Sequence, residues 1–163
     1  MRTYEVQSLC KAVGGTLSAG TGETLIAGGV STDTRNLPAG ALFVALAGER
    51  FDAHDFLDAA VEAGAAGLLV SRVPEGFDPG ETAVVVVPDT LRALQRLARW
   101  YRDQLDVVVI GITGSNGKTS TKDLTASVLS QRHAVHATQG NFNNHIGLPL
   151  TILSASEEDE ILV

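Results

Sequence analysis

The order of hydrophobic and polar positions along the 163-residue chain predicts strands that alternate with helices. Short apolar runs typical of buried strands are found at 41–46, 65–71, 83–88, 107–110 and 134–137. Apolar residues recur at helical spacing in the segments 3–13, 54–64, 89–103 and 118–131. Because such alternation is typical of parallel sheets with crossover helices, we predict the α/β fold class.

The same pattern predicts two domains joined by a helix. Residues 1–88 form the first, a small α/β domain, and the helix 89–103, with Asp89 as its N-terminal cap, connects it to the second. The second domain begins near 104 and contains only two or three strands, the last of them in "EILV" at 160–163. Since so small a parallel sheet makes a poor domain on its own, we expect the chain to be the N-terminal piece of a longer protein.

Composition and charge exclude several classes of protein. The net charge is −7 and Lys and Arg do not cluster, so a nucleic-acid-binding surface is not expected. Cys10, predicted to face the core, is the only cysteine, which excludes a disulfide within the chain and a cysteine-based zinc site. The polar N-terminus and the short apolar runs predict neither a signal peptide nor membrane insertion. We therefore expect a cytoplasmic protein, acting as a monomer.

A glycine-rich loop follows the strand 107–110 and is the main candidate for chemistry. It reads Gly111-x-x-Gly114-x-x-Gly117-Lys118-Thr119, whereas the strict phosphate-binding loop would have its first glycine at the position of Ile112. The physics of the two loops is the same, because glycines let backbone N–H groups face phosphate oxygens and the following helix adds its positive end. The expected backbone donors are Thr113, Gly114, Ser115, Asn116 and Gly117. Lys118 can reach the outer phosphates, and the Thr119 hydroxyl can bind Mg²⁺.

Two other interpretations of this loop remain open. A dinucleotide-binding loop would carry no lysine here, and it would place an acidic residue at the end of the next strand, where Thr138 stands. A glycine turn with a purely structural role is the second. The order of strand, loop, Lys-Thr and helix favours a nucleoside triphosphate site over both.

Two segments carry a resemblance to a known family. "TGSNGKTS" (113–120) and "TQGNFNNHIGLPLTIL" (138–153) resemble the Mur ligases, the ATP-dependent enzymes that build the peptide stem of the bacterial cell-wall precursor. Residues 29–71 are similar to the uridine-nucleotide domain of the same family, through Asp33-Thr34-Arg35, Pro38-x-Gly40, Phe43-Val44-Ala45-Leu46 and Gly64-Ala65. Folylpolyglutamate synthetase shares the loop but not this domain. The resemblance extends over nearly the whole chain.

The resemblance implies a reaction and its substrates. The Asn-rich segment is similar to that of the members that add D-alanyl-D-alanine to UDP-N-acetylmuramoyl-tripeptide, using ATP and Mg²⁺ and passing through an acyl phosphate. In that reading Lys118 is the catalytic contact to the transferred phosphate and Thr119 the metal ligand. Asn141, Asn144 and His145 follow the strand 134–137 and would contact ATP at the carboxyl edge of the sheet. Alternatively, these side chains only brace the loop.

The first domain would bind the uridine diphosphate of the substrate. Ser31, Thr34 and Arg35 are the candidate residues, unless Arg35 merely pairs with Asp33. Asp55 is a candidate helix cap, and His133 and His136 show no evident carboxylate or cysteine partner for a metal site.

Other functions within and outside the family also remain open. The sister ligase that adds the third stem residue is one, and a non-catalytic uridine-nucleotide-binding module with a vestigial loop is another, although the intact Lys118 and Thr119 argue against decay. In the family a magnesium-binding glutamate, a carbamylated lysine and a C-terminal domain follow the part that this chain matches. We therefore expect residues 1–163 alone to have no ligase activity.

Overall fold

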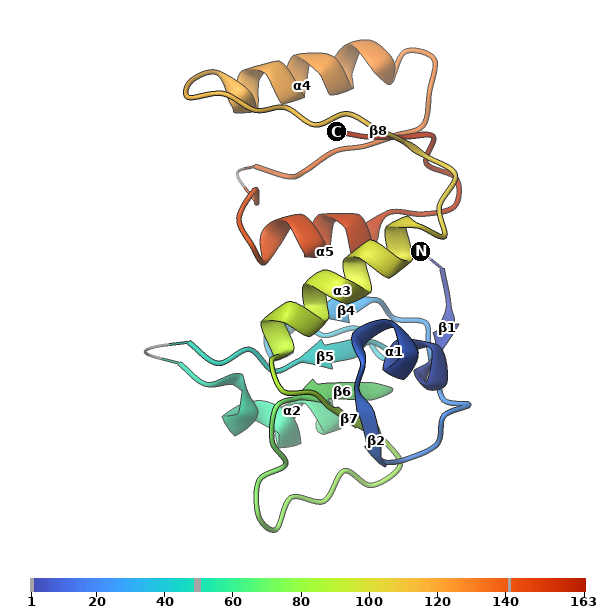
Figure 1. Cartoon of the computed structure of the whole chain (residues 1–163), viewed down its shortest axis with the longest axis vertical. Helices are drawn as coiled ribbons and strands as arrows, with labels where there is room; N and C mark the ends of the chain where they lie inside the picture. Colours follow the sequence, from blue (N-terminus) through green and yellow to red (C-terminus); the bar gives the residue numbers. More distant parts are fainter. Residues whose placement is uncertain (1, 49–50, 141) are drawn as a thin grey trace. The chain divides into compact units, whose positions relative to one another are not determined.

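The computed structural model describes residues 2–48, 51–140 and 142–163, which divide into two compact units (Figure 1). The first unit is Arg2–Leu97 and the second is Ala98–Val163. Helix α3 (Thr90–Arg102) contains the division, within the segment predicted to connect two domains. Both units combine helices with parallel strands, so the predicted α/β class is confirmed.

The first unit is built on a five-stranded sheet with the strand order β2-β7-β6-β5-β4. Its strands are β2 (Thr16–Ala19), β4 (Val30–Ser31), β5 (Leu42–Val44), β6 (Gly67–Val70) and β7 (Ala83–Val86). The pairs from β4 to β7 are parallel, as predicted, whereas β2 pairs with β7 in the antiparallel sense at the edge. Every residue of the central strands except Val86 is buried, which explains why these strands read as uninterrupted apolar runs.

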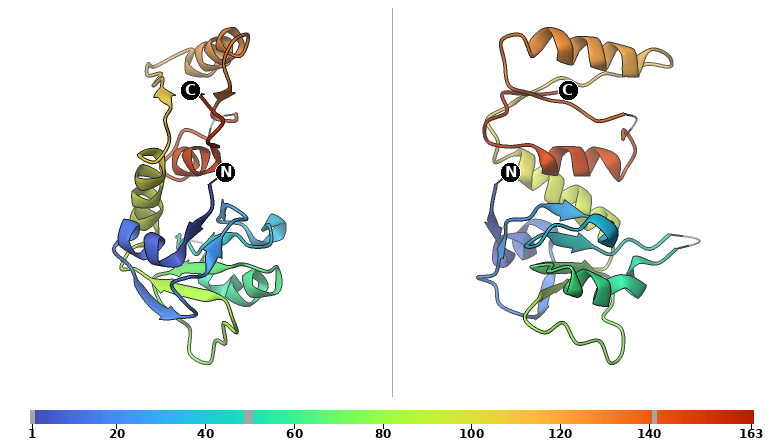
Figure 2. Two further views of the ribbon diagram at one scale, coloured as in Figure 1. Left: turned by 90° about the vertical axis from the view of Figure 1, so that its right-hand side faces the viewer. Right: turned by 180° about the vertical axis from the view of Figure 1, so that it is seen from behind.

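Helices cover both faces of this sheet. One face packs Phe43, Leu68 and Val84 against η2 (Ala53–Phe56) and α2 (Leu57–Glu62) in a continuous buried cluster. On the other face lie α1 (Val6–Val13) and the first part of α3 (Figure 2). A hydrogen bond of 3.2 Å from Arg96 Nη1 to the carbonyl of Val13 links these two helices. A short 3₁₀ helix, η1 (Thr34–Asn36), follows β4.

The first predicted helix begins later than its apolar spacing suggested. Instead of helix, Tyr4–Glu5 forms strand β1, paired in the antiparallel sense with β3 (Leu25–Ile26). The pairing partner lies about twenty residues away, so helical spacing around residues 3–5 could not reveal it. The helix ends as predicted at Gly14, whose φ of 71° is the left-handed conformation that terminates helices. Cys10, predicted to be a core residue, is only partly buried, and this burial raises the pKa of its thiol.

The second unit places its last strand in the centre of a three-stranded parallel sheet, in the order β8-β10-β9. Its strands are β8 (Val108–Val109), β9 (Val135–His136) and β10 (Ile161–Leu162), and its own helices are α4 (Lys118–Leu129) and α5 (Gly147–Ser154). The strands pass between α4 and α5 (Figures 1 and 2). The predicted cap of α3 is confirmed, since Asp89 Oδ1 accepts the N–H of Arg92 at 2.9 Å.

Helix α5 was not predicted from the sequence. Its residues GLPLTILS are almost entirely apolar, so they show neither the polar face of a surface helix nor the alternation of a strand. Pro149 is tolerated because it stands in the first turn, where backbone N–H groups have no intrahelical partner. The end of α5 is held by Tyr101, whose hydroxyl donates to the carbonyl of Ala155 at 2.7 Å. Over the part of the chain that the structure describes, no helix is both long and apolar enough to cross a membrane.

Gly28 provides a test of packing in the first unit. A Cβ atom at this position would lie 2.2 Å from the carbonyl oxygen of Ala39 and 2.5 Å from the nitrogen of Ala41. We expect Gly28→Ala to lower the free energy of unfolding by at least about 2 kcal/mol, because both neighbours are backbone atoms that cannot rotate away. Urea denaturation would measure the change.

Gly48→Ala is the matched control, since its Cβ would meet its nearest neighbour, the carbonyl of Phe51, at 3.5 Å. This control should change the free energy of unfolding by less than about 0.5 kcal/mol. Equal effects of the two substitutions would contradict the packing described here.

Candidate functional site

The glycine loop between β8 and α4 has a backbone conformation that only glycine adopts easily. Gly114 has φ +144° and Gly117 has φ +76°. A Cβ atom at Gly117 would meet no atom within 4 Å, so this glycine is required by the turn and not by packing. Residues 113–117 are exposed, which leaves the loop open to a ligand.

The start of α4 gives this open loop a local positive potential. Among the described residues no side chain caps the helix, whose first backbone bond runs from Thr121 N–H to the carbonyl of Gly117 (2.9 Å). Lys118 Nζ donates to the carbonyl of Gly114 at 2.6 Å, which holds the ammonium group over the loop. Thr119 is exposed in the first turn. Uncapped N–H groups, a lysine and a helix N-terminus together suit a polyphosphate.

The segment after β9 lies at the same edge of the sheet, because β8 and β9 both run parallel to β10. Asn141 lies outside the described residues. Asn144 Oδ1 accepts the N–H groups of Ile146 (3.0 Å) and Gly147 (2.7 Å), so its oxygen braces the start of α5. His145 is exposed in the same turn. The oxygen of Asn144 therefore braces the loop, as the alternative interpretation expected. Contacts of Asn141, Asn144 and His145 with nucleotide stay a prediction.

The two histidines near β9 have structural partners. His133 Nδ1 lies 3.1 Å from Glu160 Oε2, so the expectation that no carboxylate stands near it was wrong. His136 Nε2 lies 3.0 Å from both the Thr151 carbonyl and Ser154 Oγ, which ties β9 to α5. In residues 2–48, 51–140 and 142–163, no three His, Cys, Asp or Glu side chains are grouped so that they could hold a metal ion.

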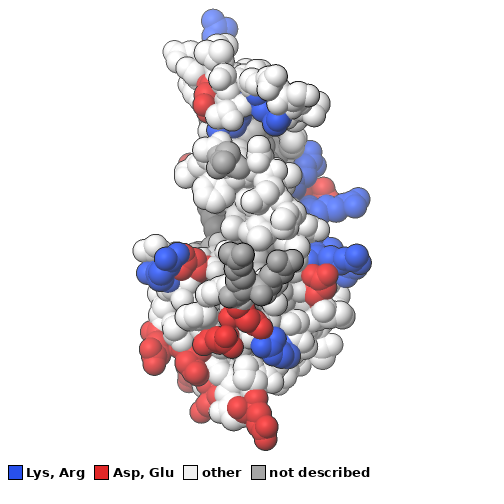
Figure 3. Space-filling view, turned by 90° about the vertical axis from the view of Figure 1, so that its left-hand side faces the viewer, with Lys and Arg blue, Asp and Glu red and all other residues white. Residues whose placement is uncertain are grey.

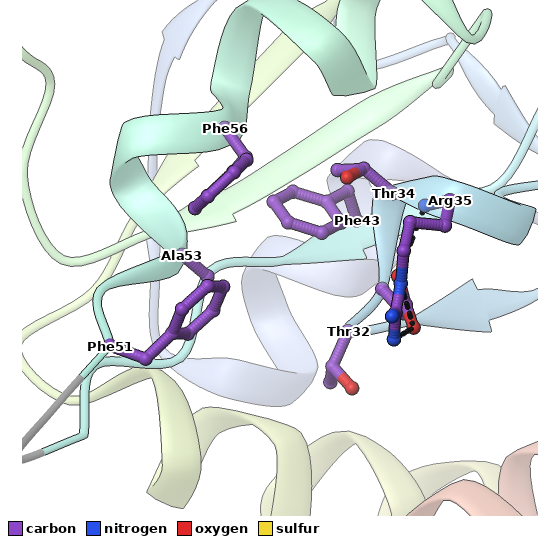
Figure 4. A pocket seen from close by; sticks show the side chains of 8 residues that line it. Thr32, Thr34, Arg35, Phe43, Phe51, Ala53 and Phe56 are labelled. Atoms are coloured by element: carbon purple, nitrogen blue, oxygen red, sulfur yellow. Dashed lines mark hydrogen bonds and ion pairs between the residues drawn. The ribbon is translucent and has the colours of Figure 1, made fainter.

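A pocket of about 400 Å³ opens in the first unit. Its walls are formed by Thr32, Asp33, Thr34, Arg35, Phe43, Phe51, Ala53 and Phe56. Figure 4 shows the aromatic rings on one side and the threonine and arginine side chains on the other. The rings of Phe51 and Phe56 are stacked, with centroids 5.1 Å apart and an interplanar angle of 21°. A planar group with polar substituents would match these two kinds of surface.

Two of the three predicted substrate-binding residues line this pocket. Thr34 and Arg35 do so, whereas the Ser31 hydroxyl exchanges bonds with the backbone of Asp33 at 3.0 Å and shapes the turn. Arg35 Nε also lies 2.9 Å from Asp33 Oδ1, so the local pair considered from the sequence is present. The Arg35 side chain is nevertheless 83% exposed. Phe51 and Phe56 were not predicted from the sequence, where their places on either side of the Asp52–His54 pair are the only signal for them.

A hydrogen-bond network centred on the buried ring of His54 supports the wall that carries Phe51, Ala53 and Phe56. Asp52, and not Asp55, caps η2 by accepting the His54 N–H at 3.0 Å. The His54 ring is fully buried, with Nδ1 2.6 Å from Asp52 Oδ1. Its Nε2 accepts the backbone N–H of Ser71 at 2.9 Å. Bonds from the His54 backbone N–H, and then from Arg72, hold the pKa of Asp52 well below its usual range.

The residue types Asp52, His54 and Ser71 are those of a hydrolytic triad, but the geometry gives them another role. A backbone N–H is a donor only, so Nε2 carries no proton and Nδ1 donates to Asp52. Nε2 therefore already has a donor from the backbone, and the buried ring is closed to substrate. We conclude that the network is a brace that joins η2 to the end of β6.

Comparisons with known proteins assign both parts of the chain to one family. The family model described as Mur ligase family, catalytic domain, matches residues 27–102, and the Mur ligase middle domain matches residues 112–163. The chain is 51% identical over 159 residues to UDP-N-acetylmuramoyl-tripeptide–D-alanyl-D-alanine ligase of Bacillus subtilis (strain 168), covering 97% of this chain and 34% of that relative.

Solved structures give the same picture. A crystal structure of MurF from Acinetobacter baumannii matches with a TM-score of 0.89 and 36% identity, over 100% of this chain and 35% of that chain. MurF ligase from Thermotoga maritima in complex with ADP matches with a TM-score of 0.72 and 36% identity, over 82% of this chain and 30% of that chain. The chain thus spans about a third of the length of the relatives that it matches.

If the network is a brace, removing the His54 ring should have a large effect on the free energy of unfolding. We expect His54→Ala to lower the free energy of unfolding by about 2–4 kcal/mol, because it leaves a cavity and removes the acceptor of the Ser71 N–H. Urea denaturation would measure it. His133→Ala, at a ring that is 47% exposed, is the control and should cost less than about 1 kcal/mol. The interpretation as a brace fails if the two variants are equally stable.

The ion pair of Asp33 and Arg35 in the pocket wall leads to a prediction about the pKa of Asp33. The Arg35 side chain, followed by its backbone N–H, lowers the pKa of Asp33 to about 2. Since the folded pKa is depressed, the pair stabilises the fold fully above the unfolded pKa of about 4, and this is lost as the pH falls towards 2. We expect Arg35→Ala to raise the pKa of Asp33 part of the way to its usual value, since the backbone N–H remains.

Carbon-detected NMR of the Asp33 carboxyl group would measure this pKa directly. Arg72→Ala, which removes a guanidinium paired with Asp52 instead, should leave the pKa of Asp33 unchanged. An unchanged Asp33 pKa in Arg35→Ala would show that the side chain does not form the pair in solution.

Proposed function

Since this chain belongs to the Mur ligase family, we propose that it forms the N-terminal part of the ligase that joins D-alanyl-D-alanine to UDP-N-acetylmuramoyl-tripeptide at the expense of ATP. The observation that carries the proposal is the 51% identity over 159 residues with the B. subtilis enzyme of that name. The Asn-rich segment 140–145 favours this member over the sister ligase that adds the third stem residue. A ligase that consumes ATP and a UDP-linked substrate would act in the cytoplasm.

ATP would bind at the glycine loop of the second unit. The similar T. maritima ligase was solved with ADP, and the loop here is open, uncapped and next to Lys118. Backbone N–H groups of residues 113–117 would contact phosphate oxygens, and the Lys118 ammonium would leave the carbonyl of Gly114 for the outer phosphate. Because the chain is acidic overall, this attraction has to be local. On the face in Figure 3, Lys and Arg lie in separate small groups among Asp and Glu.

Mg²⁺ would be bound largely by the phosphates themselves. The Thr119 hydroxyl, in the first turn of α4, is the ligand that we assign to this chain. The other ligands would be phosphate oxygens, water and the glutamate that the family places after the part matched by this chain. The bound ion would neutralise charge on the phosphate during its transfer to the peptide carboxylate.

The residues of this chain would act by positioning and charge. The amine of D-alanyl-D-alanine would attack the acyl phosphate of the tripeptide, forming the amide and releasing phosphate. Lys118 would stabilise the transferred phosphoryl group, whose negative charge spreads over its oxygens during transfer. Neither the phosphoryl transfer nor the attack of the amine needs a proton donor from the glycine loop. This agrees with a loop that presents backbone N–H groups and one lysine.

The UDP group would bind in the pocket of the first unit. The stacked rings of Phe51 and Phe56 would pack against the planar base, and the Thr34 hydroxyl would bond to polar atoms of the nucleoside. The exposed Arg35 would bind the diphosphate, for which its planar group suits two oxygens at once. Ser31 would hold the turn that presents these side chains.

Lys118→Ala tests the proposed reaction. In the product of the complete reading frame, we expect kcat to fall at least about 100-fold, because a charge aimed at the transferred phosphate is lost. Phosphate release that depends on D-alanyl-D-alanine, UDP-N-acetylmuramoyl-tripeptide and ATP would be measured. Lys11→Ala, on the exposed side of α1, is the control and should behave as the wild type. Turnover of Lys118→Ala within tenfold of the wild type would refute the role given to Lys118.

A further inference from the structure

Lys122 lies near the proposed ATP site, but the function proposed above gives it no role. It lies on α4 one helical turn after Lys118, yet its side chain is only 13% exposed. Its ammonium group donates to the carbonyls of Thr138 and, at 3.3 Å, Gly140, and lies 3.0 Å from Asp123 Oδ1. These three acceptors match the three donors of an ammonium group. Lys122 thus uses all three donors on protein atoms, whereas Lys118 makes a single hydrogen bond, to the carbonyl of Gly114, among the described residues.

The segment that Lys122 contacts is also held from its other side. The N–H and hydroxyl of Thr138 both donate to the carbonyl of Val163, at 3.0 and 3.3 Å, directly after β10. Gly140 then turns the chain with φ +52°. Thr138 is thus fixed between β10 and α4, and the asparagine loop, which we define as residues 142–146, follows two residues after the Lys122 contact at Gly140.

The sheet connects the two loops of the proposed ATP site only through the strand between them, β10. The glycine loop follows β8 and the asparagine loop follows β9, and these are the outer strands, each paired only with β10. Helix α4 begins at the glycine loop, so its Lys122 is a direct link between the helix of one loop and the backbone of the other. A charged donor to carbonyl groups makes a stronger bond than a neutral one, which suits this purpose.

We propose that Lys122 is a positioning residue that sets the distance between the glycine loop and the asparagine loop, and so the geometry of the bound nucleotide. This inference rests on the proposed function. Lys122 acts through the carbonyls of Thr138 and Gly140 and does not touch the phosphates. Its loss lets the asparagine loop move away from α4 while the sheet remains paired.

Lys122→Met tests this inference in the product of the complete reading frame, since methionine keeps the length of the stem and removes the donors. We expect the KM for ATP to rise about tenfold or more, with little change in the KM for D-alanyl-D-alanine. Amide hydrogen exchange should become faster at residues 142–146 and stay unchanged in α3. Lys122→Arg keeps a charged donor and should recover most of the affinity for ATP. Lys11→Met should match the wild type in all measurements.

The outcomes separate this inference from the proposed function. Wild-type values of both the ATP KM and the exchange at 142–146 in Lys122→Met would overturn the inference, as would a parallel loss of thermal stability and of affinity for both substrates. If Lys122→Met does not fold, Lys122→Gln decides, because its shorter and uncharged side chain should still raise the ATP KM and leave the KM for D-alanyl-D-alanine unchanged. A wild type without ligase activity would refute the proposed function, whereas exchange at 142–146 would still decide whether Lys122 fixes the loop.

Discussion

The pairing of β10 with both β8 and β9 is the interaction on which the second unit depends. Ile161 and Leu162 form parallel ladders with both neighbours, and β8 and β9 are not paired with each other. The parallel register brings the carboxyl ends of β8 and β9 to one edge of the sheet, where the glycine loop and the asparagine loop emerge. Ile161 and Leu162 therefore bring together two loops that both lie earlier in the sequence.

The two candidate sites would attract nucleotides by different physical means. The glycine loop offers backbone N–H groups and one lysine, so it can draw a polyphosphate to a protein whose net charge is −7. The pocket of the first unit offers aromatic rings and hydroxyls, and its wall is kept in place by the buried ring of His54. A phosphate group and a base would each meet the surface that suits it, on separate units of one chain.

Much of the fold could be predicted because its signals are local. The apolar runs of β5, β6 and β7 and the helical spacing of α2, α3 and α4 each lie within a dozen or so residues, and the structure contains all six. Helix α5 was missed because an apolar segment around Pro149 shows no period. Strand β1 was missed because its partner β3 lies far along the chain. The antiparallel direction of β2 likewise depends on β7, more than sixty residues away.

The sequence by itself determined the glycine loop, with Lys118 and Thr119 behind it, because glycine spacing and the start of a helix are properties of consecutive residues. Only the tertiary structure decided that Phe51 and Phe56 border a pocket, that Ser71 orients His54, and that Lys122 links α4 to Thr138. The last two contacts join residues 17 and 16 positions apart, on different elements. Local patterns fix which element forms, whereas the distance between side chains on two elements depends on how the elements pack.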